Sequence, residues 1–170
     1  KINCKNLILG AAVGYTWEDL KIFIKSLRKF SNCRVILIFE NILSNKLKNK
    51  LKNYNIDYFI YKEKNLKNIP GLINSKSDVG QRRYGMYEFV LKNIKKKPNR
   101  ILLTDTRDVV FQNDLFKNKF KKSINFFLEG AKILKDNRNS RWLKRTVGEN
   151  DFEKIKRKTI SCAGTTFGNY

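Results

Sequence analysis

The chain has no histidine among its 170 residues. This absence excludes metal sites built on imidazole, Ser-His-Asp and Cys-His nucleophile systems, and a histidine general base. Any chemistry must therefore use carboxylates, hydroxyls, cationic groups or a metal ion that carboxylates hold.

Cysteine and long apolar runs are also scarce. Cys4, Cys33 and Cys162 are widely spaced, odd in number and form no CxxC pair, so we expect no disulfide framework and a reducing, cytoplasmic location. No stretch approaches the ~18–20 consecutive apolar residues of a membrane span. The apolar stretch near the N-terminus lacks the layout of a signal peptide and is better explained as a first strand.

Acidic residues are few, 15 against 37 basic ones, which gives a formal net charge of +22. The lysines are spread along the chain among asparagine and isoleucine, a pattern that favours solvated faces over one concentrated patch. A surface for polyanions is the alternative, and with it a basic nucleic-acid-binding α/β domain without catalysis. No helix-turn-helix, zinc or RNP-like motif supports that alternative, so we expect no specific nucleic-acid partner.

Hydrophobic periodicity predicts alternating strands and helices. Compact apolar runs predict strands at 6–12, 34–40, 56–62, 100–105 and 124–130, and residues 159–168 are expected to form a strand that ends in a turn of small residues. Helical spacing predicts helices at 16–30, 44–54 and 82–97, with short helices at 140–149 and 151–158. An irregular stretch at 63–81 is expected to be a long loop. With 41% hydrophobic residues the chain can bury one core, so we predict one domain over residues 1–170, an α/β fold with a mostly parallel sheet.

The stretch ILLTDTRDVVFQNDLF (101–116) carries the clearest chemical signal. Asp105 follows an apolar strand, and ligands of open parallel sheets bind at the carboxyl ends of the strands. Asp105 and Asp108 are hard oxygen ligands suited to Mg²⁺ or Mn²⁺, ions that complete their coordination with water and phosphate oxygens. The alternative is that an aspartate caps a turn and pairs with Arg107.

These residues resemble the acidic signature of nucleotide-sugar-dependent glycosyltransferases of the GT-A fold. Together with FFLEG, NSRWLKRTVGE and ISCAGTTFGNY, they resemble a set of GT-A transferases with a Thr-Asp-x-Arg-Asp-Val motif and a later Ser-Cys-(Ala/Ser)-Gly-Thr-Thr turn. The resemblance implies a three-layer α/β/α domain that moves a sugar from a nucleoside-diphosphate sugar to a hydroxyl of a glycan or another acceptor. The spacing departs from the usual Asp-x-Asp, so either Asp105 or Asp108 could be the main metal ligand.

The resemblance also implies roles for residues elsewhere in the chain. The nucleotide-sugar site would be formed by Gly10, Ala11, Ala12, Tyr15, Arg82, Arg83, Asp105, Gly164 and Thr165. Small residues let backbone approach a ligand closely, although they also permit helix-on-sheet packing. Two arginines at the start of a helix suit a nearby anion, although they could instead be solvated.

Catalysis would use Glu129 and Arg107. Glu129, expected at the end of a strand, is a candidate base for an inverting reaction, as are Asp136 and Glu149. Arg107 could pair with diphosphate oxygens or fix the two aspartates. Trp142 is expected in the core, with sugar stacking as the alternative. The choice between inverting and retaining chemistry, and between a minimal enzyme and a truncated chain, stays open.

Overall fold

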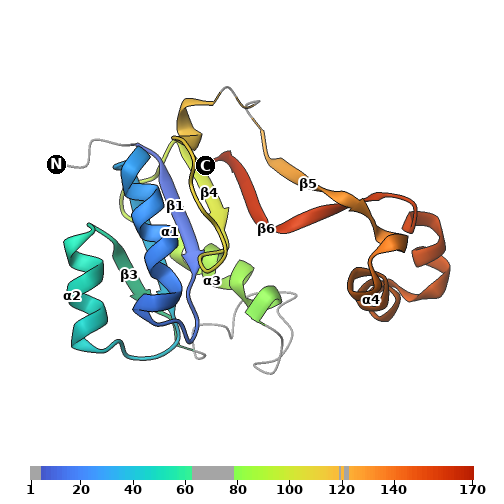
Figure 1. Cartoon of the computed structure of the whole chain (residues 1–170), viewed down its shortest axis with the longest axis horizontal. Helices are drawn as coiled ribbons and strands as arrows, with labels where there is room; N and C mark the ends of the chain where they lie inside the picture. The colour runs from blue at the N-terminus through green and yellow to red at the C-terminus, as the bar shows by residue number, and fades with distance from the viewer. Residues whose placement is uncertain (1–4, 63–78, 119, 121–122) are drawn as a thin grey trace. The chain divides into compact units, whose positions relative to one another are not determined.

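The computed structural model describes residues 5–62, 79–118, 120 and 123–170 (Figure 1). Its strands are β1 (Leu7–Ala11), β2 (Arg34–Phe39), β3 (Asp57–Ile60), β4 (Arg100–Thr104), β5 (Asn125–Lys132) and β6 (Thr159–Asn169). Its α-helices are α1 (Trp17–Phe30), α2 (Asn45–Asn53), α3 (Val79–Asn93) and α4 (Asn137–Ile155). Two short 3-10 helices are η2 (Leu115–Lys117) and η3 (Ile133–Lys135).

The strands form one mixed sheet in the order β3-β2-β1-β4-β6-β5. The pairs β3–β2, β2–β1 and β1–β4 are parallel, and β6 runs antiparallel to β4. The predicted α/β class with a mostly parallel sheet is therefore confirmed. The carboxyl ends of β1 to β4 lie at the same edge of the sheet, which is where ligands bind in such folds.

Helices cover both faces of the parallel strands. Leu7, Leu9, Ile36 and Ile38 point to one face, where α3 packs against them through residues that include Met86. Because side chains alternate along a strand, Ile8, Val35 and Leu37 point to the other face, and all are fully buried. Figure 1 shows α1 crossing in front of β1. These are the three layers that the sequence resemblance implies.

Local sequence explains where the first two helices begin. Thr16 precedes α1, and both its backbone N–H and its hydroxyl donate to the Asp19 carboxylate at 2.8 Å. Ser44 caps α2 by accepting from the backbone N–H of Leu47 at 3.3 Å. The guanidinium of Arg28 then ties α1 to the end of α2 by donating to the carbonyls of Tyr54 and Asn55 at 2.8 and 2.9 Å.

Internal contacts divide the chain into two compact units. The first comprises residues 1–125 and 164–170, and the second comprises residues 126–163. In the second unit Ile133, Phe152 and Ile160 form a small core beside Leu143. Its helix α4 is interrupted at Gly148, which has a φ of 80°. The interruption divides α4 into two segments, where the sequence predicts two short helices. One domain over residues 1–170 stays a prediction.

Several sequence predictions need correction. Helix α3 begins at Val79 and ends at Asn93, earlier at both ends than the predicted 82–97; most of the predicted loop at 63–81 lies outside the described residues. Trp142 is 50% exposed and is not part of the core. The predicted turn at SCAGTT is part of the continuous strand β6.

The cysteines also differ from expectation. Cys33 is disulfide-bonded, Cys162 is free, and Cys4 lies outside the described residues. The prediction of unpaired cysteines is therefore wrong at Cys33, and a cytoplasmic location stays a prediction without that support. In the described part of the chain, no helix is both long and apolar enough to cross a membrane.

Candidate functional site at the carboxyl edge of the sheet

Asp105 is the first residue after β4 and is held by backbone contacts on both sides. Its N–H donates to the carbonyl of Gly164 in β6 at 2.7 Å, and its carbonyl accepts from the Thr104 hydroxyl at 3.0 Å. Its Oδ2 atom lies so close to Gly164 that a Cβ at residue 164 would be only 3.0 Å from Asp105 Cγ and nearer still to Oδ2. The carboxylate position therefore depends on the missing side chain at Gly164.

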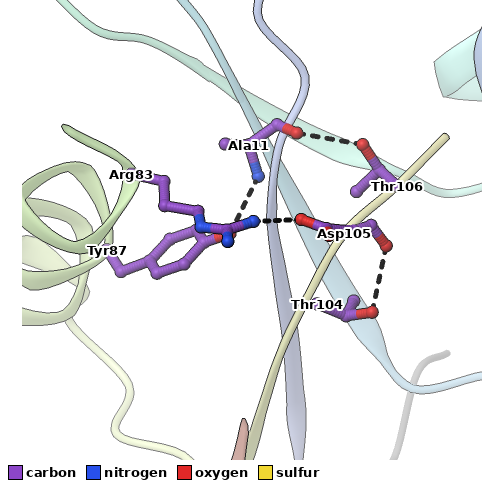
Figure 2. A network of polar contacts seen from close by, with 6 residues as sticks. All are labelled: Ala11, Arg83, Tyr87, Thr104, Asp105 and Thr106. Carbon is purple, nitrogen blue, oxygen red and sulfur yellow. Dashed lines mark hydrogen bonds and ion pairs between the residues drawn. The ribbon is translucent and has the colours of Figure 1, made fainter. Parts of the chain in front are cut away.

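Helix α3 supplies the partner of this carboxylate. Nη1 of Arg83 forms an ion pair with Oδ1 of Asp105, and the arginine side chain is only 12% exposed (Figure 2). A guanidinium buried to this degree loses much of its hydration, so it needs anionic partners. The pair fixes a positive and a negative group side by side at the end of β4.

Two further contacts fix the end of β1 next to this pair. The Tyr87 hydroxyl accepts from the N–H of Ala11 at 3.3 Å, and the Thr106 hydroxyl donates to the carbonyl of Ala11 at 2.9 Å (Figure 2). Burial raises the pKa of Tyr87 to about 12, so the phenol stays neutral at physiological pH. Both backbone groups of Ala11 are thus engaged by side chains from other elements.

A cavity of about 500 Å³ opens above these residues. Its lining consists of Ala11, Tyr15, Gly80, Arg83, Asp105, Arg107 and Asp108. Two guanidinium groups and two carboxylates therefore share one cavity at the carboxyl edge. Burial raises the pKa of the Tyr15 phenol, Arg107 opposes that shift, and the aspartates Asp105, Asp108 and Asp19 add to it.

A second cavity, of about 360 Å³, shares Tyr15 with the first. Trp17 and Phe39 contribute aromatic surface to it, and the segment 41–44 after β2 forms another wall. Within that segment Ile42 is 87% exposed. The two cavities together give a charged compartment next to a largely apolar one.

Three of the other predicted residues, Gly10, Ala12 and Thr165, do not line the charged cavity. Ala12 is fully buried, and a Cβ at Gly10 would press on the methyl group of Thr106 and come within 3.1 Å of the Thr104 carbonyl. Thr165 lies opposite Thr104 in the β4–β6 pairing. These residues shape the edge of the sheet without lining the cavity.

Arg82 and Glu129 lie elsewhere. Arg82 forms an ion pair with Glu40 at 2.8 Å and does not line the cavity, although its neighbour Arg83 does. Glu129 lies in the middle of β5 and is exposed, not at the strand end as predicted, because β5 continues to Lys132. It belongs to the second unit, whereas Asp105 belongs to the first.

The carboxylates of the cavity fit a divalent metal that phosphate oxygens help to hold. The described residues contain no group of three or more Cys, Asp or Glu side chains placed to hold a metal on their own. Asp105 and Asp108 do share the cavity, however, and Mg²⁺ or Mn²⁺ commonly uses one or two carboxylates and takes its remaining ligands from water and substrate phosphates.

Sequence reasoning missed three residues that shape the site. Tyr87 and Thr106 are not among the residues that the sequence pattern singles out, and Gly80 falls within the predicted loop at 63–81. The available signal for Thr106 was its place between Asp105 and Arg107: in extended chain, neighbouring side chains alternate, and Thr106 is buried while both neighbours line the cavity. Nothing local indicated that Tyr87 would reach Ala11.

Comparison with known proteins supports the fold. No protein-family model and no curated protein matches the sequence. The solved structure of the mannosyltransferase Ktr4p from S. cerevisiae matches 99% of this chain and 56% of its own length, with a TM-score of 0.50 and 14% identity.

Two further solved structures are similar. Core-mannan synthase A (CmsA/Ktr4) from Aspergillus fumigatus, solved in a Mn/GDP form, matches 98% of this chain and 60% of its own, with a TM-score of 0.48 and 9% identity. The glycosyltransferase GlyE of Streptococcus pneumoniae TIGR4 matches 90% of this chain and 39% of its own length, with a TM-score of 0.46 and 15% identity. The chain thus spans about half the length of the solved structures that it matches. At 14% identity the likeness to Ktr4p shows the fold alone, and the activity has to be argued from the site.

Proposed function

We propose that the protein is a glycosyltransferase that moves a sugar from a nucleoside-diphosphate sugar to the hydroxyl of a glycan or another acceptor. The observation that carries this proposal is the cavity that brings Arg83, Arg107, Asp105 and Asp108 together at the carboxyl edge of the sheet. A site with both cations and carboxylates suits a ligand that is itself an anion with a bound metal ion. A metal-bound diphosphate has this chemistry.

Each charged side chain has a part in holding such a ligand. Asp105 and Asp108 would hold Mn²⁺ or Mg²⁺, and the spacing leaves open which of them is the main ligand. The bound ion supplies Lewis-acid neutralisation of the charge that develops on the leaving diphosphate. Arg83 and Arg107 would bind the phosphate oxygens, which suit the paired N–H donors of a guanidinium group. Arg83 lies against Asp105, so a diphosphate held near Asp105 would lie within reach of its guanidinium group.

The neighbouring apolar cavity suits the nucleoside. Trp17 and Phe39 offer aromatic surface to a planar base, and Tyr15 borders both cavities. The backbone of β1 approaches the same place at Ala11. A nucleotide with its nucleoside in the apolar cavity and its diphosphate beside Arg83 would pass Tyr15, which lines both cavities.

For the acceptor side of the reaction we propose carboxylates of the second unit. Glu129 remains our candidate for the base of an inverting reaction, with Asp136 and Glu149 as the two other candidates in the second unit. Arg107 would stabilise charge on the leaving group, because it lines the cavity beside both aspartates. Arg82 and Gly164 would act by supporting the site: one is paired with Glu40, and the other lies behind Asp105.

Thermal stabilisation tests the proposal. The purified chain is melted with UDP, GDP, ADP or CDP, each with and without Mn²⁺, and Asp105→Asn and Asp108→Asn are measured in parallel. The matched control is Asp151→Asn, an exposed carboxylate on α4 that pairs with Lys154. We expect one nucleotide to raise the melting temperature only when Mn²⁺ and both cavity aspartates are present.

Other outcomes would count against the proposal. No stabilisation by any nucleotide, together with binding of DNA at low salt that does not depend on Asp105 or Asp108, would favour the basic nucleic-acid-binding alternative. Equal stabilisation of the wild-type protein and both aspartate variants would show that the nucleotide binds away from this cavity.

A further inference from the structure

A larger cavity, of about 960 Å³, follows the strand β3 and has no residue in common with the two cavities above. Cationic side chains surround it: Lys48 and Lys52 from α2, Lys95 and Lys96 just after α3, and Arg34 at the start of β2. One carboxylate, Asp57, lines it as well and is paired with Arg34 at 3.1 Å. The cavity therefore has a strong excess of positive charge, which favours an anionic ligand.

The strand beside this cavity has an open edge. Among the strands that the structure describes, β3 is the outermost on its side of the sheet, and Figure 1 shows it beside α2. The N–H of Tyr61 donates to the carbonyl of Phe39 at 2.7 Å. Because the backbone groups of a parallel strand alternate in direction, Phe59 faces β2 as Tyr61 does, whereas Tyr58 and Ile60 turn their N–H and C=O groups away from β2. An edge of this kind can accept another strand.

The floor of the cavity is apolar. Ile36, Ile56, Val90 and Ile94 contribute to its lining, and Tyr58 is 39% exposed. An added strand would direct every second side chain to one face of the sheet. Every second side chain of the added strand could therefore pack on the apolar floor, while the side chains between them, if charged, could reach the lysines.

We propose that the edge of β3 binds an extended acidic peptide segment of a partner protein, which adds to the sheet as a further strand. The backbone groups of Tyr58 and Ile60 would pair with the peptide, and Lys48, Lys52, Lys95 and Lys96 would meet its carboxylates. This surface lies apart from the nucleotide site and does not depend on the proposed transferase activity.

A peptide suits this surface better than a nucleic acid. Single-stranded nucleic acids bind on a series of aromatic side chains over which successive bases stack. Tyr58 and Phe59 are the aromatic residues in the lining, and the rest of the floor is aliphatic. An open strand edge is of no use to a polynucleotide, whereas a peptide backbone pairs with it directly.

The test uses a fluorescent nine-residue peptide of alternating glutamate and valine, measured by anisotropy at 0.15 M salt. We expect the double variant Lys48→Glu/Lys52→Glu to weaken binding at least tenfold, and Lys95→Glu/Lys96→Glu to do the same. The matched control Lys132→Glu/Lys135→Glu, in the second unit, should change the dissociation constant less than threefold. Hydrogen exchange should slow at the amides of Tyr58 and Ile60 when the peptide is bound.

Three results would overturn the proposal. The first is a peptide with proline at alternate positions that binds as tightly as the original, because proline cannot donate backbone hydrogen bonds. The second is exchange at Tyr58 and Ile60 that the peptide leaves unchanged. The third is oligo-dT that binds more tightly than the peptide and loses its affinity in the same lysine variants.

Discussion

Gly164→Ala is the substitution for which the structure makes the sharpest prediction. The new Cβ would lie 3.0 Å from Cγ of Asp105 and closer still to Oδ2. The carboxylate cannot turn away at low cost, because Arg83 is paired with its other oxygen and the Asp105 N–H is bonded to the carbonyl of residue 164 itself. The methyl group must therefore displace the carboxylate, the strand β6, or both.

The expected magnitudes follow from this crowding. Restoring ordinary van der Waals contact requires a displacement of roughly 1 Å. Overpacking of this kind costs about 1–3 kcal/mol of the free energy of unfolding, measured by urea denaturation. A displacement of ~1 Å at a catalytic group can cost ~100-fold in rate. We therefore expect Gly164→Ala to weaken Mn²⁺-dependent nucleotide binding and transferase activity far more than it lowers stability.

Gly168→Ala is the control on the same strand. A Cβ there would meet its nearest neighbour at 3.5 Å, which is an ordinary contact. It should leave both the free energy of unfolding and nucleotide binding close to those of the wild-type protein. The reasoning is refuted if Gly164→Ala unfolds at the same urea concentration as Gly168→Ala, since Asp105 would then have room that the structure denies it.

Three further predictions concern the stability of the fold and the state of the cysteines. Gly10→Ala should lower the free energy of unfolding by about 1–3 kcal/mol in urea denaturation, because its methyl group would press on the buried side chain of Thr106. Arg28→Met should cost about 2–4 kcal/mol in the same assay, because it removes the donor of hydrogen bonds to four backbone carbonyls; an unchanged midpoint would contradict that role. Alkylation in denaturant without reductant should label Cys162 and spare Cys33, as peptide mass spectrometry would show, whereas equal labelling would disprove the disulfide.

The sequence predicted the main elements, and which residues lie at the carboxyl edge of the sheet, for physical reasons. An apolar strand followed at once by Asp105 can only bring that residue to the edge of a parallel sheet, and the structure places it there. Ala11 and Tyr15 follow from the same rule, since β1 neighbours β4 and both strands end at one edge. Hydrophobic periodicity was sufficient for α1 and α2, whose capping residues mark their first turns.

Other features depend on distant contacts that a local pattern does not contain. Arg82 and Arg83 are adjacent in sequence, but one turns to Glu40 and the other to Asp105, because successive residues on a helix point about 100° apart. The small residues around Gly164 suggested a turn, whereas the structure shows that residue 164 has to be small because the Asp105 carboxylate packs against it. The length of β5 was underestimated because Ala131 and Lys132 continue a strand without apolar alternation.

Nucleotide titration by calorimetry tests the central claim most directly. One set of titrations measures the affinity, its dependence on Mn²⁺ and its dependence on a cavity aspartate. The nucleotide that gives the largest thermal shift is titrated into the wild-type protein and into Asp108→Asn, with and without Mn²⁺. We predict binding to the wild-type protein that Mn²⁺ strengthens at least tenfold, and loss of that increment in Asp108→Asn. Binding that is the same in all four titrations would contradict a metal-dependent nucleotide site at Asp105 and Asp108.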